Sequence, residues 1–276
     1  MENWRSILEC QLQNYPTELS VEDAIEVYSN APLNDLMFVA MERRRDQVPG
    51  KLVTYMIDRN INYTNVCTIN CHFCSFHRSP GHNESYTQNV DQISERIVEL
   101  ERLGGCRILM QGGVNPSLPI EWYTELLEEL SKRHPSISLD CFSPIEIEGI
   151  AEVSGLSTIE VLSRFRDSGL HGLPGGGAEM LVDNVRHGIS PRKGSSENWL
   201  RVMSEAQSLG LITSATNVFG FGESHSERVE HMARIRSLQS EAALSGNPGF
   251  TSFVSWPVML ENNAFGKIGL RRNSTG

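Results

Sequence analysis

The sequence predicts an α/β fold in which parallel strands form part of a TIM-type (β/α) barrel with about six strand–helix units. Short runs rich in β-branched residues alternate with long amphipathic stretches, which is typical of a parallel sheet with helices outside it. Cysteines, glycines and other residues typical of binding sites fall where the predicted strands end, and in a barrel these ends share one face. No G-x-G-x-x-G pattern follows the first strand, which weakens the doubly wound alternative.

The first part of the chain, residues 1–50, is predicted to be a helical extension that caps one end of a barrel core spanning residues 51–276. Ser20 places a capping hydroxyl before one amphipathic helix, and a second helix is predicted from Pro32 to Gln47. These helices carry no convergent set of polar residues, so we expect the functional site in the core.

The core alternates strands and helices in a regular order. Strands are predicted at residues 61–66, 107–111, 137–142, 170–173, 211–219 and 250–256. Helices are predicted at residues 90–103, 119–133, 146–152 with 158–167, 178–185 with 196–209, and 224–243. The cysteine-rich loop follows the first of these strands, and glycine or serine motifs follow the next three.

Composition excludes several classes of function. The chain has 276 residues, 39% of them hydrophobic, so it can bury a core. The formal net charge of −10 argues against nucleic-acid and anionic-membrane partners. The sequence has neither an apolar run of 18 residues nor an apolar signal core at its N-terminus, and we therefore expect a cytoplasmic protein with reduced thiols. Three of its six cysteines, Cys10, Cys106 and Cys141, are expected to be small buried residues.

The other three cysteines, Cys67, Cys71 and Cys74, form a C-x3-C-x2-C motif. Thiolates are ligands for soft metals, and an iron–sulfur cubane usually takes four of them. Three thiolates would leave one iron open, as a catalytic zinc site leaves one position open. The motif therefore predicts a catalytic 4Fe-4S cluster.

A structural zinc site is the alternative reading of the same motif. His77 follows Cys74 with two residues between them, so the four side chains have the composition of a Cys3His site. Structural zinc usually staples small domains and uses two separated ligand pairs, neither of which describes this chain. A disulfide among three clustered thiols is not expected in a chain without a secretion signal.

The motif and its flanking residues resemble those of the radical S-adenosylmethionine enzymes. Three segments together resemble the dehypoxanthine futalosine cyclases of the futalosine route to menaquinone: Asp58-Arg-Asn-Ile-Asn-Tyr-Thr-Asn-Val-Cys67, Gln111-Gly-Gly, and Leu173-Pro-Gly-Gly-Gly-Ala-Glu179. The group that shares these motifs also includes aminofutalosine synthase and the deazaflavin synthases. The resemblance runs from about Leu19 to the end of the chain.

The resemblance implies a reaction and its cofactors. Cys67, Cys71 and Cys74 would hold a 4Fe-4S cluster whose open iron binds S-adenosylmethionine. A 5′-deoxyadenosyl radical would take the C4′ hydrogen of the ribose of dehypoxanthine futalosine, after which the substrate closes a ring. Such enzymes take electrons from a donor such as flavodoxin or ferredoxin.

The resemblance and the strand ends together suggest cofactor-binding residues. Phe73 would meet the adenine through its backbone, although it is equally explained as a buried aromatic. The superfamily usually has a Gly-Gly-Glu segment that meets the cofactor ammonium, and this chain has Gln111, Gly112 and Gly113 in its place. The acid is absent here, but the bare glycines still allow close backbone approach to the cofactor. The alternative is that the glycines only form a tight turn after the strand. Ser143 is a candidate for the cofactor ribose or carboxylate, or a simple turn residue.

The glycine run at residues 175–177 is predicted to open a helix whose amides hold a carboxylate. Glu179 would bind an ammonium or a ribose hydroxyl, or would only complement the helix dipole. The candidate catalytic residues are Asp140, His171 and Glu179. Asp140 is a candidate because a carboxylate buried within a strand needs a polar partner or a functional role, and His171 because histidine titrates near neutral pH. His72, His77 and His82 are further titratable residues, of which the first two border the cluster loop.

The sequence also departs from the cyclases. The segment from Gly220 to Ser224 lacks a histidine that cyclases usually have, and the segment from Trp256 to Leu260 lacks their Gln-Pro. Cyclase chains usually extend further, so we expect a truncated or divergent barrel. Aminofutalosine synthase, a deazaflavin-synthase-like enzyme and a zinc-stapled binding domain remain the alternatives.

Overall fold

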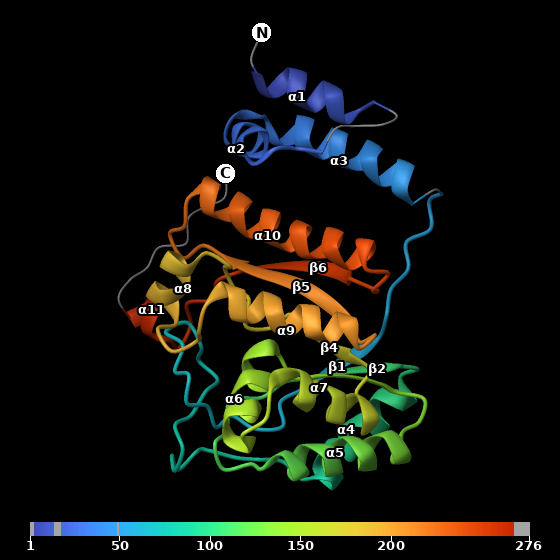
Figure 1. Ribbon diagram of the computed structural model, residues 1–276, viewed down its shortest axis with the longest axis vertical. Coiled ribbons are helices and arrows are strands. Elements are labelled where there is room, and N and C mark those ends of the chain that lie inside the picture. Colours follow the sequence, from blue (N-terminus) through green and yellow to red (C-terminus); the bar gives the residue numbers. More distant parts are fainter. Residues whose placement is uncertain (1–2, 14–17, 49, 268–276) are drawn as a thin grey trace. The chain divides into compact units, whose positions relative to one another are not determined.

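The computed structural model describes residues 3–13, 18–48 and 50–267 (Figure 1). The chain divides into two compact units. One unit contains Met1–Tyr55 with Glu223–Ala233, and the other contains Met56–Gly222 with Arg234–Gly276.

The N-terminal unit contains three helices, α1 (Asn3–Gln11), α2 (Val21–Asn30) and α3 (Leu33–Gln47). The Ser20 side chain accepts a hydrogen bond from the Asp23 N–H, so α2 begins at the capping serine that the sequence identifies. The helices bury a small cluster of apolar side chains, which consists of Trp4, Ile7, Leu8, Val27 and Val39.

The larger unit is built on one sheet of six parallel strands. They are β1 (Asp58–Ile61), β2 (Arg107–Met110), β3 (Ser138–Cys141), β4 (Gly172–Leu173), β5 (Ile212–Phe219) and β6 (Phe250–Pro257). Each strand pairs with the next one in the sequence, in the order β1 to β6. The sheet curls into half of a barrel (Figure 1), which confirms the predicted partial (β/α) barrel.

Helices follow the strands along the outside of the curled sheet (Figure 1). Those of the core are α4 (Val90–Arg102), α5 (Ile120–Arg133), α6 (Pro144–Ser154), α7 (Thr158–Asp167), α8 (Asp183–Ile189), α9 (Ser196–Ser208) and α11 (Ala264–Lys267), and α10 spans His225–Leu244. Contacts run from α4 to α5, from α5 to α7 and from α7 to α9. Their apolar faces and the sheet share one continuous core, to which α4 contributes Ile93, Ile97 and Leu100.

The first strand differs from the prediction of residues 61–66, because it ends at Ile61. Polar side chains then take over the backbone hydrogen bonds. Asn62 Nδ2 donates to the Gln111 carbonyl at 2.9 Å, and Thr64 Oγ1 donates to the Tyr86 carbonyl at 2.7 Å. The Asn65 side chain bonds the backbone of residues 84 and 86. These bonds give the backbone of the neighbouring segments side-chain partners in place of a continued sheet ladder, and the chain leaves the sheet here.

The helix predicted at residues 178–185 begins later, at Asp183. Gly177 has φ +82° and Glu179 has φ +39°, and neither conformation continues a right-handed helix. The glycine run is therefore a turn before the helix and not the helix N-terminus. The predicted helix start at residue 178 was wrong for this reason, whereas the binding of a carboxylate by the glycine amides stays a prediction.

Two cysteine predictions were also wrong. Cys10 and Cys106 are exposed, and only Cys141 of the three is buried.

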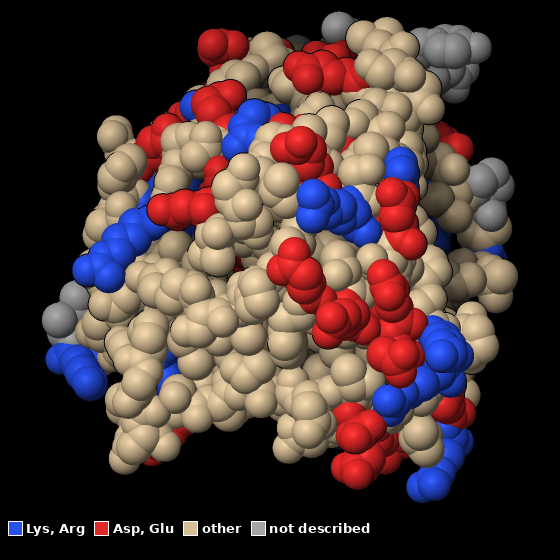
Figure 2. All heavy atoms as spheres, turned by 60° about the horizontal axis from the view of Figure 1, so that its bottom comes forward, with Lys and Arg blue, Asp and Glu red and all other residues tan. Residues whose placement is uncertain are grey.

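Among the described residues, no helix is both long and apolar enough to cross a membrane. The face shown in Figure 2 carries acidic and basic side chains next to one another rather than one continuous basic area.

Candidate active site

A cavity of about 170 Å³ lies at the carboxyl ends of the first four strands. Segments that follow β1, β2, β3 and β4 all contribute to its wall, as expected for the site face of a barrel. All three motif cysteines line it. So do the other residues that the sequence suggests for cofactor binding: Phe73, Gln111, Gly112, Gly113, Ser143 and Glu179.

Bare glycines allow the strand ends to approach the cysteine loop. A Cβ on Gly113 would lie 2.3 Å from the Val66 carbonyl oxygen and 2.6 Å from Cys67 Cβ. A Cβ on Gly112 would lie 2.8 Å from the Tyr63 ring. The turn after β2 therefore needs both glycines to pack against the segment that starts the cysteine loop.

Hydrogen bonds from distant segments hold the cysteine loop in place. The Cys67 N–H donates to the Arg78 carbonyl at 2.9 Å, and the His72 N–H donates to the Ile189 carbonyl at 3.0 Å. The Cys74 N–H closes a turn onto the Cys71 carbonyl at 3.1 Å. The loop is thus anchored at its start, middle and end.

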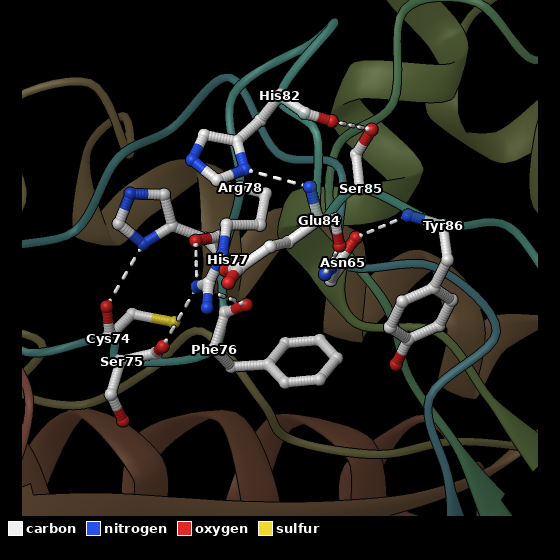
Figure 3. Close-up of polar contacts among 10 residues, drawn as sticks. All are labelled: Asn65, Cys74, Ser75, Phe76, His77, Arg78, His82, Glu84, Ser85 and Tyr86. Atoms are coloured by element: carbon white, nitrogen blue, oxygen red, sulfur yellow. Dashed lines mark hydrogen bonds and ion pairs between the residues drawn. The ribbon is translucent and has the colours of Figure 1, made fainter.

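The segment after Cys74 is organised by one arginine, Arg78 (Figure 3). Its guanidinium donates to the carbonyls of Ser75, Phe76 and His77 at 3.2, 3.4 and 3.0 Å. It also pairs with Glu84 at 2.7 Å. Satisfying three consecutive carbonyls fixes the path of the chain where it leaves the last cysteine.

The cysteine side chains are all free thiols, and none forms a disulfide. Burial raises the pKa of the Cys71 thiol, and the nearby Lys193 ammonium opposes that shift. Across residues 3–13, 18–48 and 50–267, no three His, Cys, Asp or Glu side chains converge closely enough to hold one metal ion.

This geometry counts against the zinc alternative, in which one ion holds each sulfur at about 2.3 Å. His77 instead directs Nδ1 to the Cys74 carbonyl at 3.0 Å, and it does not line the cavity. A 4Fe-4S cluster distributes its thiolates over different irons, so it requires thiols around a space and not around a point. Three free thiols around one cavity fit a cluster.

A buried carboxylate, Glu146, ties the strand ends together beside the cavity. Oε1 accepts from the Tyr63 hydroxyl at 2.7 Å and from the Gly112 N–H at 2.9 Å, and Oε2 accepts from the Ser143 hydroxyl at 2.6 Å. Glu146 is only 4% exposed, and burial raises its pKa while these three donors oppose the shift. The carboxylate therefore joins the segments that follow β1, β2 and β3.

A buried ion pair lies across the cavity wall. Lys193 Nζ lies 2.6 Å from Glu179 Oε2, and both side chains are buried. The same ammonium lies 4.9 Å from the centre of the Phe73 ring. This arrangement presents one cation and one anion together where a zwitterionic ligand would need both.

The glycine turn beside this pair is held by a buried arginine. Arg186 is 1% exposed and donates to the carbonyls of Gly177, Ala178 and Gly194 at 2.8–2.9 Å. Burial lowers its pKa, and the neighbouring carboxylates, Glu179 first, oppose the shift. A cation that satisfies three carbonyls fixes the conformation that places Glu179 in the cavity.

A second cavity, of about 320 Å³, occupies the inside of the curled sheet, and we call it the lumen cavity. Inward positions on the strands supply a mixed lining, with apolar side chains such as Leu109 and Leu173 and with polar ones: Asn60, Arg107, Asp140, Ser214, Thr216 and Ser252. Closed barrels usually fill this space with branched apolar side chains. The polar side chains suit an occupant that carries hydroxyl or amide groups.

Asp140 lies within the lumen cavity, where Ser138 donates to it at 2.9 Å and Arg107 lies 3.6 Å away. Burial raises its pKa, and both neighbours oppose the shift. His171 is exposed, accepts from the Leu139 N–H at 3.1 Å and lines neither cavity. His72 and His82 also lie outside both cavities.

Sequence reasoning missed three residues of this site: Glu146, Lys193 and Arg186. Ser143 and Glu146 form an S-x-x-E pair, which is also the ordinary signature of a helix start. Lys193 and Arg186 lie in a polar segment that resembles a surface loop in sequence. The signal available was the cluster of cations that follows the glycine run in a chain with a net charge of −10.

The family model of the radical SAM superfamily matches residues 61–235. The chain belongs to this superfamily of enzymes.

Within it, the chain is 41% identical over 249 residues to cyclic dehypoxanthine futalosine synthase of Halalkalibacterium halodurans, covering 90% of this chain and 66% of that protein. It is 36% identical over 248 residues to the protein of the same name from Streptomyces coelicolor, covering 89% and 61%. The chain thus spans just under two thirds of the length of these relatives.

A second kind of relative is nearly as similar. The 5-amino-6-(D-ribitylamino)uracil–L-tyrosine 4-hydroxyphenyl transferase of Methanococcoides burtonii is 34% identical over 253 residues, covering 92% of this chain and 68% of that protein.

Among solved structures, the hydrogenase maturase HydG matches with a TM-score of 0.72 at 16% identity, covering 93% of this chain and 54% of that chain. Methylornithine synthase PylB matches with a TM-score of 0.69 at 16% identity, covering 98% and 72%. These structural matches concern the fold alone.

Proposed function

We propose that the chain is a radical SAM enzyme that cyclises dehypoxanthine futalosine to cyclic dehypoxanthinyl futalosine in menaquinone biosynthesis. The observation that carries the proposal is the cavity lined by all three motif cysteines, from here on the cofactor cavity, which adjoins the lumen cavity. The name shared by the relatives at 41% and 36% identity supports the choice of substrate.

In this proposal Cys67, Cys71 and Cys74 hold a 4Fe-4S cluster with one open iron. When bound, the cluster and S-adenosylmethionine supply a 5′-deoxyadenosyl radical, which removes the C4′ hydrogen atom of the substrate ribose. The proposed cofactor-binding residues are Phe73, Gln111, Gly112, Gly113, Ser143 and Glu179, and we add Lys193 as a cation for the cofactor carboxylate because it lines the same cavity.

The protein side of the reaction consists of binding, orientation and exclusion of water. Lys193 and Glu179 present charges that suit a carboxylate and an ammonium, and their burial strengthens both interactions. The lumen cavity is the proposed chamber for the substrate, since the polar side chains in its lining suit ribose hydroxyls. Asp140 is the proposed proton-handling group of this chamber, because burial raises its pKa; His171 is not retained, since it lines neither cavity.

Further parts of the proposal concern the setting of the enzyme. We propose a cytoplasmic location, where thiols stay reduced, and an electron donor such as flavodoxin or ferredoxin. Residues 1–50 are proposed as a helical extension to the core of residues 51–276.

A second candidate is the tyrosine transferase reaction named for the relative from Methanococcoides burtonii, at 34% identity. The same two cavities would serve this reaction, because the hydroxyls of the ribityl chain that its substrate carries suit the polar side chains of the lumen cavity. Aminofutalosine synthase, which would add the adenosyl group to its substrate, is the third enzyme that the motifs allow.

The test uses the anaerobically reconstituted full chain with a chemical reductant. Dehypoxanthine futalosine carrying deuterium at C4′ is expected to yield the cyclic product together with 5′-deoxyadenosine that contains deuterium. Product from tyrosine and 5-amino-6-(D-ribitylamino)uracil instead would establish the transferase. With an enolpyruvyl benzoate as the substrate instead, an adenosylated product formed without free 5′-deoxyadenosine would establish an aminofutalosine synthase.

A further inference from the structure

The cofactor cavity and the lumen cavity adjoin at two shared lining residues, and we call this place the junction. Of the described residues, only Gln111 and Gly176 line both cavities. Gln111 follows the end of β2, and Gly176 lies in the glycine turn after β4. These two residues therefore lie between the two cavities.

Gln111 is fixed at this junction on three sides. Its N–H donates to the Ile61 carbonyl at 3.0 Å, and its carbonyl accepts from Asn62 Nδ2 at 2.9 Å. Its side-chain Nε2 donates to the Phe142 carbonyl at 3.0 Å. In the described part of the chain, no donor reaches the side-chain Oε1. One hydrogen-bond acceptor is therefore left available where the cavities meet.

The Phe142 carbonyl, which accepts the hydrogen bond from Gln111 Nε2, belongs to a residue with an unusual backbone conformation. Phe142 has φ +67°, a left-handed conformation that is rare for a bulky residue. Its ring is fully buried against Tyr63, Tyr123 and Phe165. Such outliers persist when their surroundings impose them, and here the result is a carbonyl aimed at the Gln111 amide.

The other side of the junction has no side chain. A Cβ on Gly176 would lie 2.4 Å from Gln111 Nε2, so only glycine leaves room for the amide. The Gly176 carbonyl accepts from Trp199 Nε1 at 3.1 Å, and Trp199 is completely buried. The amide and the bare glycine backbone thus form a rigid junction.

We propose that Gln111 positions the substrate across this junction, by accepting through Oε1 a hydrogen bond from a hydroxyl or amino group next to the carbon that gives up its hydrogen atom. The inference rests on the proposed function and names the substrate class, a ribosyl or ribityl compound held in the lumen cavity. The turn that Gln111 begins borders the cofactor, and its side-chain oxygen serves the substrate.

The test compares Gln111→Met with Gln88→Met in the reconstituted full chain. Gln88 is a matched control because its side chain, like that of Gln111, donates Nε2 to a backbone carbonyl, here that of Asn62 at 3.0 Å, and because it lines neither cavity. Equilibrium dialysis measures the affinity for dehypoxanthine futalosine and for S-adenosylmethionine, and urea unfolding reports the stability of each variant.

Gln111→Met is expected to weaken the binding of dehypoxanthine futalosine about five- to tenfold, as the loss of one hydrogen bond implies. The loss of affinity for S-adenosylmethionine should be smaller. Gln111→Met should also raise the ratio of 5′-deoxyadenosine to cyclic product, whereas Gln88→Met should match the parent in both measurements. Equal futalosine affinities in the parent and Gln111→Met, an equal loss in both variants, or a larger loss for the cofactor would overturn the inference.

A failure of the proposed function has a different signature. If the parent does not bind the futalosine, the same comparison is made with 5-amino-6-(D-ribitylamino)uracil. A selective loss in Gln111→Met with that probe would retain the inference and refute the cyclase. Absence of binding of either probe by the parent would refute both.

Discussion

The buried Glu146 network allows one prediction to be worked out in detail, the effect of Tyr63→Phe. The Tyr63 hydroxyl donates to Glu146 Oε1 at 2.7 Å, and both residues are inaccessible or nearly so. A hydrogen bond to a charged group contributes about 1.5–3 kcal/mol, whereas a neutral one contributes about 1 kcal/mol. Tyr63→Phe should therefore lower the free energy of unfolding by about 1.5–3 kcal/mol where Glu146 is ionised.

The loss should depend on pH in a defined direction. Burial raises the pKa of Glu146, so the folded chain keeps a proton that the unfolded chain loses near pH 4.3, roughly its ordinary pKa. The contribution of Glu146 to stability is therefore most favourable below that pH, and it declines as the pH rises through the folded pKa. Removing a donor raises the folded pKa further, so Tyr63→Phe should cost more at pH 8 than at pH 4.5.

The assay is urea unfolding of the parent and variant at both pH values. Tyr86→Phe is the control, because the Tyr86 hydroxyl donates weakly to a backbone carbonyl at 3.4 Å and not to a carboxylate. It should cost little at either pH. A Tyr63→Phe loss that is equal at pH 4.5 and pH 8, or that is no larger than the Tyr86→Phe loss, would refute the assigned role of Glu146.

Three further predictions concern the cofactor cavity. Cys74→Ala should sharply reduce the iron bound after anaerobic reconstitution, whereas Cys106→Ala, at an exposed cysteine away from the cavity, should leave iron content unchanged by elemental analysis. Lys193→Met should lower the free energy of unfolding, measured with urea, by about 3–5 kcal/mol, because it leaves the Glu179 carboxylate buried without its partner. The double variant Lys193→Met/Glu179→Gln should recover most of that loss. Gly177→Ala should lower the unfolding midpoint and weaken S-adenosylmethionine binding, since φ is +82° and the new Cβ would lie 2.5 Å from a side-chain carbon; an unchanged midpoint would contradict that account.

Much of the fold followed from the sequence because a parallel half-barrel depends on a simple alternation. The strand predicted at residues 107–111 and the helix predicted at residues 158–167 agree with β2 and α7 within a residue. The first strand was misplaced because Asn62, Thr64 and Asn65 bond the backbone through their side chains, an effect that residue type does not reveal.

The site was only partly accessible from the sequence. The cysteine spacing and the strand-end glycines identified segments that do line one cavity. Glu146 and Lys193 were missed because their importance comes from burial and from partners distant in the sequence, such as Tyr63 for Glu146. The glycine run was assigned to a helix start, although Glu179 adopts a positive φ that ends any such helix.

The central claim is that Cys67, Cys71 and Cys74 hold a cluster with one open iron. Electron paramagnetic resonance of the anaerobically reconstituted and reduced chain, recorded with and without S-adenosylmethionine, tests it most directly. The account predicts about four irons per chain and a cluster signal that changes when the cofactor is added. A colourless chain with one zinc ion, or a cluster signal indifferent to the cofactor, would contradict it.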